Sequence, residues 1–217
     1  GNPYLRPQFT QTFELGYKKN WNTGSAFLSG YYRMIEDPFL RVYSIDDRSG
    51  EYDIINKIYH NVGSATNTGV ELTFTQSIKD FWKLSGSFNG YNNVINAFEG
   101  ELLFPYKRNF SFEETKDLTW DIKLNNQFTL ARQTQIQLTA IYIAPKNIPQ
   151  GKQLSRSSVD IGVKKIIMKG KGEITFSFTD IFNDFGLRQE IQGNGFKVVY
   201  ENYYETQIIR LGYKQKF

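Results

Sequence analysis

The chain has 217 residues and a net charge of +4, from 26 basic and 22 acidic side chains, a balance too weak to indicate nucleic-acid binding. Because cysteine is absent, a disulfide framework and thiolate metal sites are excluded, and no apolar run approaches the roughly 20 residues of a membrane-spanning helix. Aromatic residues make up 16% of the chain and there are 18 glycines, a composition that favours an all-β protein rich in turns.

Alternation of apolar and polar residues predicts the strands, because a period of two gives a strand one apolar and one polar face. The first predicted strand covers residues 8–19, and the second runs from Ala26 past Pro38 towards Ile45. Pro38 would interrupt a central ladder, so the upper part of the second strand is expected to be irregular or to project as an edge. Residues 46–50 are rich in turn-forming types and predict a tip.

Seven further stretches with the same alternation follow, at residues 70–78, 82–94, 118–125, 135–142, 158–164, 174–179 and 203–217. In the last of them Ile209, Leu211 and Tyr213 lie on one side, opposite Arg210 and Lys214. The total is about nine strands. Aromatic residues concentrate near the strand ends, where the two girdles of a membrane barrel would lie; they are Tyr17, Trp21, Trp82, Trp120, Tyr142 and Phe182.

The connections between these strands alternate in length. Short turns are expected near 20–24, 79–82, 131–134 and 169–172, and long loops near 46–66, 98–116, 147–156 and 185–200. This alternation is typical of outer-membrane barrels, with short periplasmic turns and long extracellular loops, and a Greek-key sandwich would not produce it so regularly. Many strands are also about 11 to 15 residues long, above the five or six of soluble sheets.

The predicted fold is therefore an antiparallel transmembrane β-barrel. An odd number of strands cannot close a typical single-chain bacterial barrel. Residues 1–217 are thus expected to be one C-terminal barrel segment, with the earlier strands and any plug domain outside this sequence. Replacing Ile122 or Phe176 by arginine is expected to be costly on the lipid face, whereas Thr119 and Thr175 on the other face are expected to tolerate it.

Four motifs occur in order along the chain. They are Asn2-Pro3-Tyr4-Leu5-Arg6-Pro7-Gln8 followed by Phe13-Glu14-Leu15-Gly16-Tyr17, then Gly69-Val70-Glu71-Leu72, Asp180-Ile181-Phe182-Asn183, and the closing Leu211-Gly212-Tyr213-Lys214-Gln215-Lys216-Phe217. This series resembles the C-terminal barrel strands of TonB-dependent outer-membrane receptors, and most of all their outer-membrane β-barrel branch. Two positions depart from the pattern, since Gln8 replaces an acid and Gln215 an aromatic residue.

The resemblance implies an outer-membrane receptor of a Gram-negative bacterium, with a barrel of about 22 strands. Such receptors take up a scarce substrate through their extracellular loops, and the inner-membrane TonB system remodels a plug inside the barrel. The partners implied are outer-membrane lipid, the β-barrel assembly machinery, the rest of the barrel and its plug, the TonB system through that plug, and a surface lipoprotein. Nucleic acid is not among them.

The candidate ligand contacts lie in two loop stretches, because loops on a rigid scaffold often carry binding. The stretches are 104–112 and 188–200, and the candidate residues are Phe104, Tyr106, Lys107, Arg108, Arg188 and Tyr200. The alternative is that these residues are ordinary rim structure. The resemblance also implies that Tyr213 and Phe217 form the signal by which the assembly machinery recognises the barrel.

No enzyme and no cofactor are expected. His60 is the single histidine, so neither a His/Cys metal site nor a Ser/His/Asp set can be built around it with conviction. The acidic pairs Asp46-Asp47, Glu99/Glu101 and Glu113-Glu114 could bind Ca²⁺, but solvation of loops is the better explanation. A passive or structural outer-membrane barrel and a soluble all-β carbohydrate-binding module remain alternatives, and the substrate could be a metal chelate, a peptide or a glycan.

Overall fold

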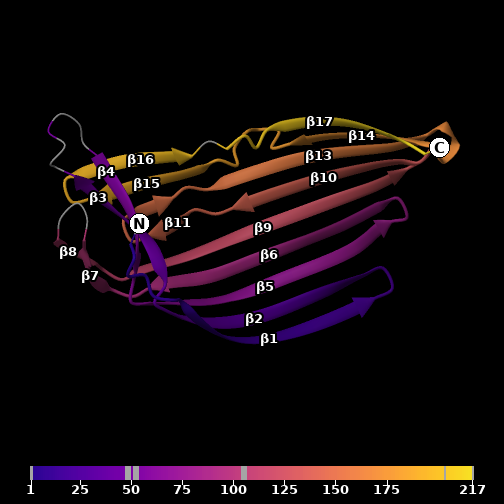
Figure 1. Ribbon diagram of the computed structural model, residues 1–217. Helices are drawn as coiled ribbons and strands as arrows, with labels where there is room; N and C mark the ends of the chain where they lie inside the picture. The colour runs from indigo at the N-terminus through magenta and orange to yellow at the C-terminus, as the bar shows by residue number, and fades with distance from the viewer. Residues whose placement is uncertain (1, 47–49, 51–53, 104–106, 203, 217) are drawn as a thin grey trace.

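The computed structural model describes residues 2–46, 50, 54–103, 107–202 and 204–216, and Figure 1 shows its arrangement. Within these residues nine long strands form one sheet in the order β1-β2-β5-β6-β9-β10-β13-β14-β17. Every neighbouring pair is antiparallel. The strands are β1 (Phe9–Trp21), β2 (Gly24–Glu36), β5 (Ser64–Lys79), β6 (Trp82–Ile95), β9 (Thr115–Leu130), β10 (Thr134–Ile143), β13 (Arg156–Ile167), β14 (Gly172–Thr179) and β17 (Ile208–Gln215). The predicted nine antiparallel strands are confirmed.

The short turns between these strands all lie at one end of the sheet, near the C-terminus in Figure 1. The short 3-10 helix η2 (Met168–Gly170) forms one of them. The opposite end, called the hairpin end below, carries the other eight strands of the described residues, none longer than eight residues. They are β3 (Phe39–Asp46), β4 (Ile54–Asn61), β7 (Phe98–Leu102), β8 (Arg108–Phe112), β11 (Lys146–Ile148), β12 (Gly151–Gln153), β15 (Leu187–Gly193) and β16 (Phe196–Asn202). The predicted division into a short-turn side and a long-connection side is confirmed.

The long connections differ from the prediction in being paired rather than irregular. Strands β3 and β4 form one two-stranded sheet, β7 and β8 another, and β11, β12, β15 and β16 form a four-stranded sheet. The predicted interruption of the second strand at Pro38 is confirmed, because β2 ends at Glu36 and the segment beyond it, β3, leaves the large sheet and pairs with β4 in a separate one. Asp37, with a φ of 51°, and Pro38, which lacks an N–H to donate, turn the chain out of the large sheet.

The register places the predicted apolar residues on one face of the nine-stranded sheet. Leu28 lies opposite Leu72, Leu72 opposite Phe88, Phe88 opposite Ile122, and Ile122 opposite Tyr142. Because successive side chains point to opposite faces, this row determines which residues of these five strands lie on the apolar face. The rest of the sheet continues it, with Leu138 opposite Ile161, Val163 opposite Phe176 and Phe176 opposite Leu211.

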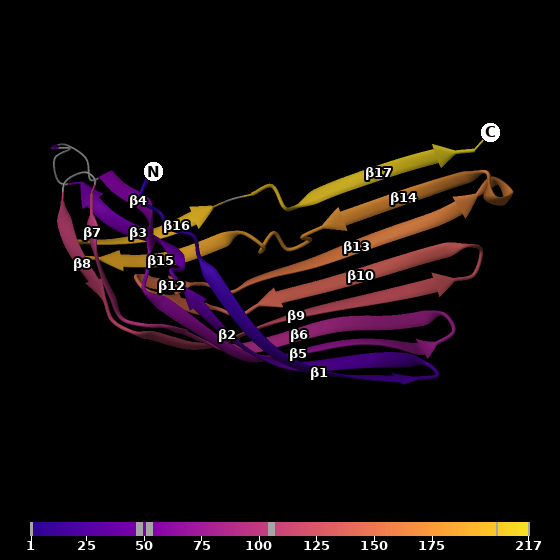
Figure 2. The same ribbon diagram turned by 60° about the horizontal axis from the view of Figure 1, so that its bottom comes forward.

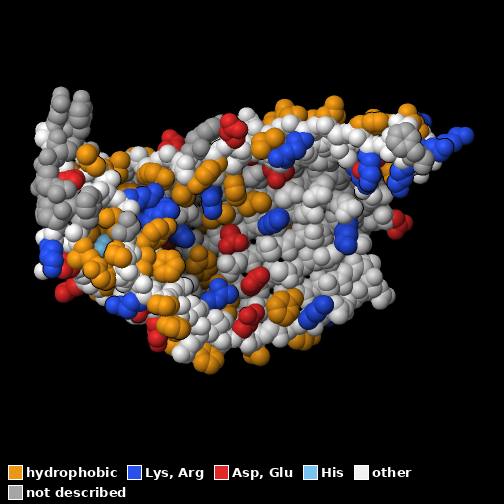
Figure 3. All heavy atoms as spheres, in the orientation of Figure 1, with side chains coloured by type: hydrophobic (Ala, Val, Ile, Leu, Met, Phe, Trp, Pro, Cys, Tyr) orange, Lys and Arg blue, Asp and Glu red, His pale blue; other side chains and the backbone are white. Residues whose placement is uncertain are grey.

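The other face is polar. In the row beside the apolar one, Ser29 lies opposite Glu71, Glu71 opposite Asn89, and Asn89 opposite Asp121. Tyr31 donates to Asn89 Oδ1 at 2.8 Å, and Asn89 Nδ2 donates to Asp121 Oδ1 at 3.2 Å. Over the long strands this polar face shows few hydrophobic side chains, which gather instead over the hairpin end (Figure 3).

The sheet is curved and open, with β1 and β17 as its two edges (Figure 2). The described residues therefore form no closed barrel. Aromatic pairs mark both ends of the long strands, as the sequence predicts. The Trp82 and Phe128 rings stack 5.8 Å apart near the short turns, and the Trp120 and Tyr142 rings lie 4.9 Å apart near the hairpin end.

Most of the buried apolar side chains lie at the hairpin end rather than between the faces of the large sheet. Val62 and Ile191 are fully buried, and a cluster of Val62, Ala65, Ile95 and Phe98 packs against Phe110 and its neighbours. No helix in the described part of the chain is long and apolar enough to cross a membrane.

The structure contradicts one expected substitution, Thr119→Arg on the polar face. Thr119 is 2% exposed and donates to Pro145 O at 3.2 Å. An arginine has no room there, so the expectation that Thr119 tolerates arginine is wrong. Thr175 is half-buried on the polar face, and its tolerance stays a prediction.

Candidate functional site

The β3–β4 hairpin crosses the polar face of the sheet at the hairpin end. The hairpin starts at β2, next to one edge of the sheet. Its Tyr43 nevertheless contacts Gln150, between β11 and β12, and Gln189 of β15, and these elements belong to connections near the other edge. Its base is closed by hydrogen bonds from Asp37 N to Gly63 O and from Val62 N to Pro38 O, at 3.0 and 2.7 Å. The hairpin therefore lies as a cover over one end of the polar face.

Gln150 holds this cover in place. Tyr43 N donates to Gln150 Oε1 at 2.8 Å, and Gln150 Nε2 donates to Tyr43 O at 2.9 Å. The amide thus pairs both backbone groups of one β3 residue, as a neighbouring strand would. The next residue, Gly151, lets the chain pack closely against β15, since its φ is +143° and a Cβ there would lie 2.0 Å from Glu190 O.

A cavity of about 450 Å³ lies beside this contact. Its lining combines two cations, several amides and aromatic rings, and includes no Asp or Glu among the described residues. The lining side chains are Phe39, Leu40, Arg41, Tyr43, Tyr59, Asn93, Ile95, Lys146, Asn147, Ile148, Pro149, Gln150, Gln153 and Gln189. A mixed apolar and polar cavity of this size is typical of a binding site for a small solute.

A second cavity, of about 280 Å³, lies next to the first and shares Tyr43 and Gln150 with it. It is lined by β3, β7, β8 and the β15–β16 turn, and Arg108 is its charged residue among those described. The Tyr43–Gln150 pair therefore separates two adjoining cavities at the hairpin end.

The first motif of the sequence fixes the base of the cover. Arg6 Nε donates to Asp37 Oδ2 at 3.0 Å, and its backbone N–H donates to Asn61 Oδ1 at 2.8 Å. Asn2 Nδ2 donates to Tyr59 O at 3.0 Å. The Arg6 guanidinium lowers the pKa of Asp37 below its usual value through the hydrogen bond.

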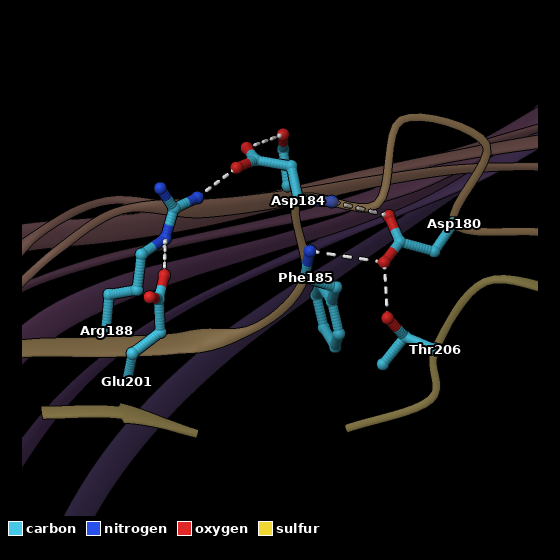
Figure 4. A network of polar contacts seen from close by, with 7 residues as sticks. Asp180, Asp184, Phe185, Arg188, Glu201 and Thr206 are labelled. Atoms are coloured by element: carbon cyan, nitrogen blue, oxygen red, sulfur yellow. Dashed lines mark hydrogen bonds and ion pairs between the residues drawn. The ribbon is translucent and has the colours of Figure 1, made fainter. Parts of the chain in front are cut away.

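The third motif forms a polar centre where β14 ends, shown in Figure 4. The Asp180 carboxylate is 2% exposed and accepts from Asp184 N at 3.1 Å, Phe185 N at 3.2 Å and Thr206 Oγ1 at 2.5 Å. Its own N–H donates to Asp160 Oδ1 at 2.8 Å. Asp180 thus joins β13 through its backbone N–H, and through its carboxylate the start of the β15–β16 hairpin and the segment before β17.

The predicted ligand contacts are only partly brought together. Arg108 lines the second cavity. Lys107 is exposed, with its Nζ 3.7 Å from Glu101 Oε2. Arg188 pairs with Asp184 and lies 3.8 Å from Glu201, while the Tyr200 ring faces the Lys57 Nζ at 3.9 Å. Lys107, Arg188 and Tyr200 line neither cavity.

Phe104 and Tyr106, and with them Phe217 and Asp47, lie outside the described residues. Tyr213 lies on β17 with 56% of its surface exposed, on the apolar face beside Ile174. Its hydroxyl donates to Gln215 Oε1 at 2.9 Å. Its predicted role in recognition by the assembly machinery stays a prediction.

Sequence reasoning missed the residues that build the cover and its cavity, chiefly Tyr43, Arg41, Lys146 and Gln150. The local signals are a short alternation in 39–45 and the sequence Pro149-Gln150-Gly151, which a turn explains equally well. As for metals, no cluster of three His, Asp or Glu placed to hold an ion occurs in the described ranges. Glu114 of the predicted acidic pairs lies 2.8 Å from Lys116 Nζ.

The fold is thus a two-faced antiparallel sheet, apolar on one side and polar on the other. Seven of its nine strands have at least ten residues, enough to span a bilayer. These features define the wall of a transmembrane β-barrel. The chain belongs to the outer membrane protein beta-barrel family, whose model matches residues 1–214. The protein is therefore located in the outer membrane, which rules out the soluble carbohydrate-binding module. Searches of curated proteins and of solved structures gave no match.

Proposed function

We propose that this chain forms part of a TonB-dependent receptor, which takes up a scarce solute across the outer membrane and catalyses no reaction. In this proposal the nine strands belong to a barrel of about 22 strands. The polar face lines the lumen, and the hairpin end is the extracellular mouth where the solute binds.

The observation that carries the proposal is the covered cavity at the end of the polar face. The β3–β4 hairpin crosses that face and, with the β11–β12 hairpin, lines a half-open cavity of about 450 Å³. A solute bound there would be held at the mouth of the lumen before it passes. The motif series that resembles TonB-dependent receptors supports the energised step.

The proposed partners follow from the faces of the sheet. The apolar face, with Leu15 and Leu211 about four-fifths exposed, would contact lipid, and the β17 edge would engage the assembly machinery. The β1 and β17 edges would pair with the remaining barrel strands, because unpaired edges are unfavourable in a membrane. A plug, the TonB system and a surface lipoprotein complete the proposed set.

The test is uptake of radiolabelled solutes by cells that carry or lack the full-length protein, each before and after depletion of TonB. We expect every solute whose uptake depends on the protein to be lost on TonB depletion as well. A small solute that enters through general porins serves as the control, and its uptake should not change.

A passive barrel is the second candidate, and the polar network of Tyr31, Asn89 and Asp121 favours it, since such a face also suits a water-filled channel. Uptake that requires the protein but persists without TonB would establish this alternative and overturn the first.

A further inference from the structure

We infer that the solute is an acidic oligosaccharide, a short chain of sugars that carry carboxylates, bound in the cavity beneath the β3–β4 hairpin. This inference rests on the proposed function, because it names the substrate of the same site. It follows from the charge, the hydrogen-bonding groups and the strand edges around that cavity.

The charge points to an anion. Arg41 donates through Nε to the Tyr59 hydroxyl at 2.8 Å, and its guanidinium lies over the Tyr59 ring, 5.1 Å from the ring centroid. It forms no ion pair with the described residues. Lys146 likewise forms no ion pair within the described ranges. The Asp117 carboxylate accepts from Asn147 N at 2.8 Å and Asn147 Nδ2 at 3.2 Å, and it does not line the cavity. Two cations facing a cavity without a lining carboxylate favour a ligand with carboxylates of its own.

The amides point to hydroxyl groups. Asn93 and Gln153 line the cavity without a hydrogen-bond partner in the described part of the chain. Each amide offers two donors and one acceptor, which suits hydroxyls that both donate and accept. The Phe39 and Tyr59 rings meet edge to face at 6.0 Å, so the wall also offers apolar surface for the C–H face of a sugar ring.

The second cavity indicates a ligand longer than one unit. It adjoins the first across the Tyr43–Gln150 pair and adds Arg108 as a third cation. Arg108 forms no ion pair with the residues described. Both cavities are partly open to solvent. In this inference an oligomer lies over the Tyr43–Gln150 pair, with carboxylates that meet Arg41 and Lys146 in one cavity and Arg108 in the other.

An acidic peptide fits less well. Extended peptides commonly bind by adding a strand to a free sheet edge. The outer edge of β3 beside the cavity is already paired at Tyr43, where Gln150 takes both backbone groups. A peptide would have to displace that amide, whereas a saccharide needs only side chains.

The test measures the Kd of the full-length protein in detergent for hexagalacturonate and for its fully methyl-esterified form, which has the same length but no charge. We expect the esterified form to bind at least about tenfold more weakly, the effect of losing a charge-assisted hydrogen bond. Arg41→Gln and Lys146→Gln should each weaken the acidic form about tenfold. Lys152→Gln, on the neighbouring β12 but lining neither cavity, should leave its Kd unchanged.

Three results overturn the inference: equal binding of both forms, tighter binding of hexaglutamate than of hexagalacturonate, and no binding of hexagalacturonate at millimolar concentration. The ester comparison uses the unaltered protein, so it stands even where a variant fails to fold. Binding in detergent needs no energy source, so this experiment tests the acidic ligand independently of the proposed TonB-dependent uptake. Hexagalacturonate binding with TonB-independent uptake removes only the energised function, and TonB-dependent uptake of an uncharged solute removes only the acidic ligand.

Discussion

The sheet and the hairpin end follow opposite rules of burial. In the nine-stranded sheet, large apolar side chains such as Leu15, Leu118 and Leu211 are more than three-quarters exposed. At the hairpin end, Val62 and Ile191 are fully buried. The hairpin end thus packs around a buried apolar core, to which Ala65 of β5 and Ile95 of β6 also contribute, while the sheet leaves its apolar face exposed, as a face toward lipid would be. Stability in one chain therefore has two sources that can be disturbed separately.

The largest expected effect is on the sheet alone. Ile122→Arg places a cation on the apolar face between Phe88 and Tyr142, and should destabilise the protein by about 2–4 kcal/mol if it lies at the bilayer midplane. The measurement is the denaturation midpoint in lipid bilayers. Thr175→Arg on the polar face is the matched control and should change it little, so equal losses from both variants would contradict the two-faced membrane sheet.

A smaller effect should be confined to the hairpin end. Gln150→Leu leaves the buried N–H and C=O of Tyr43 without partners, at about 1–3 kcal/mol for each unpaired group. Hydrogen exchange should then quicken in β3 and β4 and stay unchanged in β6 and β9. Gln153→Leu, which breaks no hydrogen bond given by the described residues, serves as the comparison. Faster exchange throughout the sheet would show that the two regions are not separate.

The smallest effect concerns pH. His60 is 8% exposed, and its ring lies edge-on to Phe110 at 5.4 Å. Burial lowers the pKa of His60 in the folded hairpin. Below about pH 6.5 His60 therefore binds a proton when the hairpin is locally unfolded but stays neutral when it is buried. The packing should therefore weaken as pH falls through that value, by at most about 1.4 kcal/mol per pH unit, and stay constant above it.

The measurement is hydrogen exchange of β4 at pH 7.5 and 5.5, corrected for the intrinsic rates. In His60→Leu the dependence should disappear, since no group in its place titrates. A dependence that persists in that variant would assign it to another residue.

The two regions also differ in how far sequence reasoning reached. The sheet was predictable, since period-two alternation such as 118–125 needs only neighbouring residues to be read, and a strand 10 to 16 residues long repeats it several times. The hairpin end was not, because β11 and β12 have three residues each, too few for a period. Its central contact joins Tyr43 to Gln150, 107 positions apart, and no local pattern encodes such a pairing.

The hydrogen bonds at the bases of the β3–β4 and β15–β16 hairpins affect how this chain can evolve. Asp37 with Gly63 closes the β3–β4 hairpin, and Asp180 with Thr206 closes the β15–β16 hairpin, before the chain rejoins the sheet. Between these points, insertions and recombination can alter residues without shifting the register of the long strands. The hairpins can thus be exchanged while the long strands of the sheet stay the same.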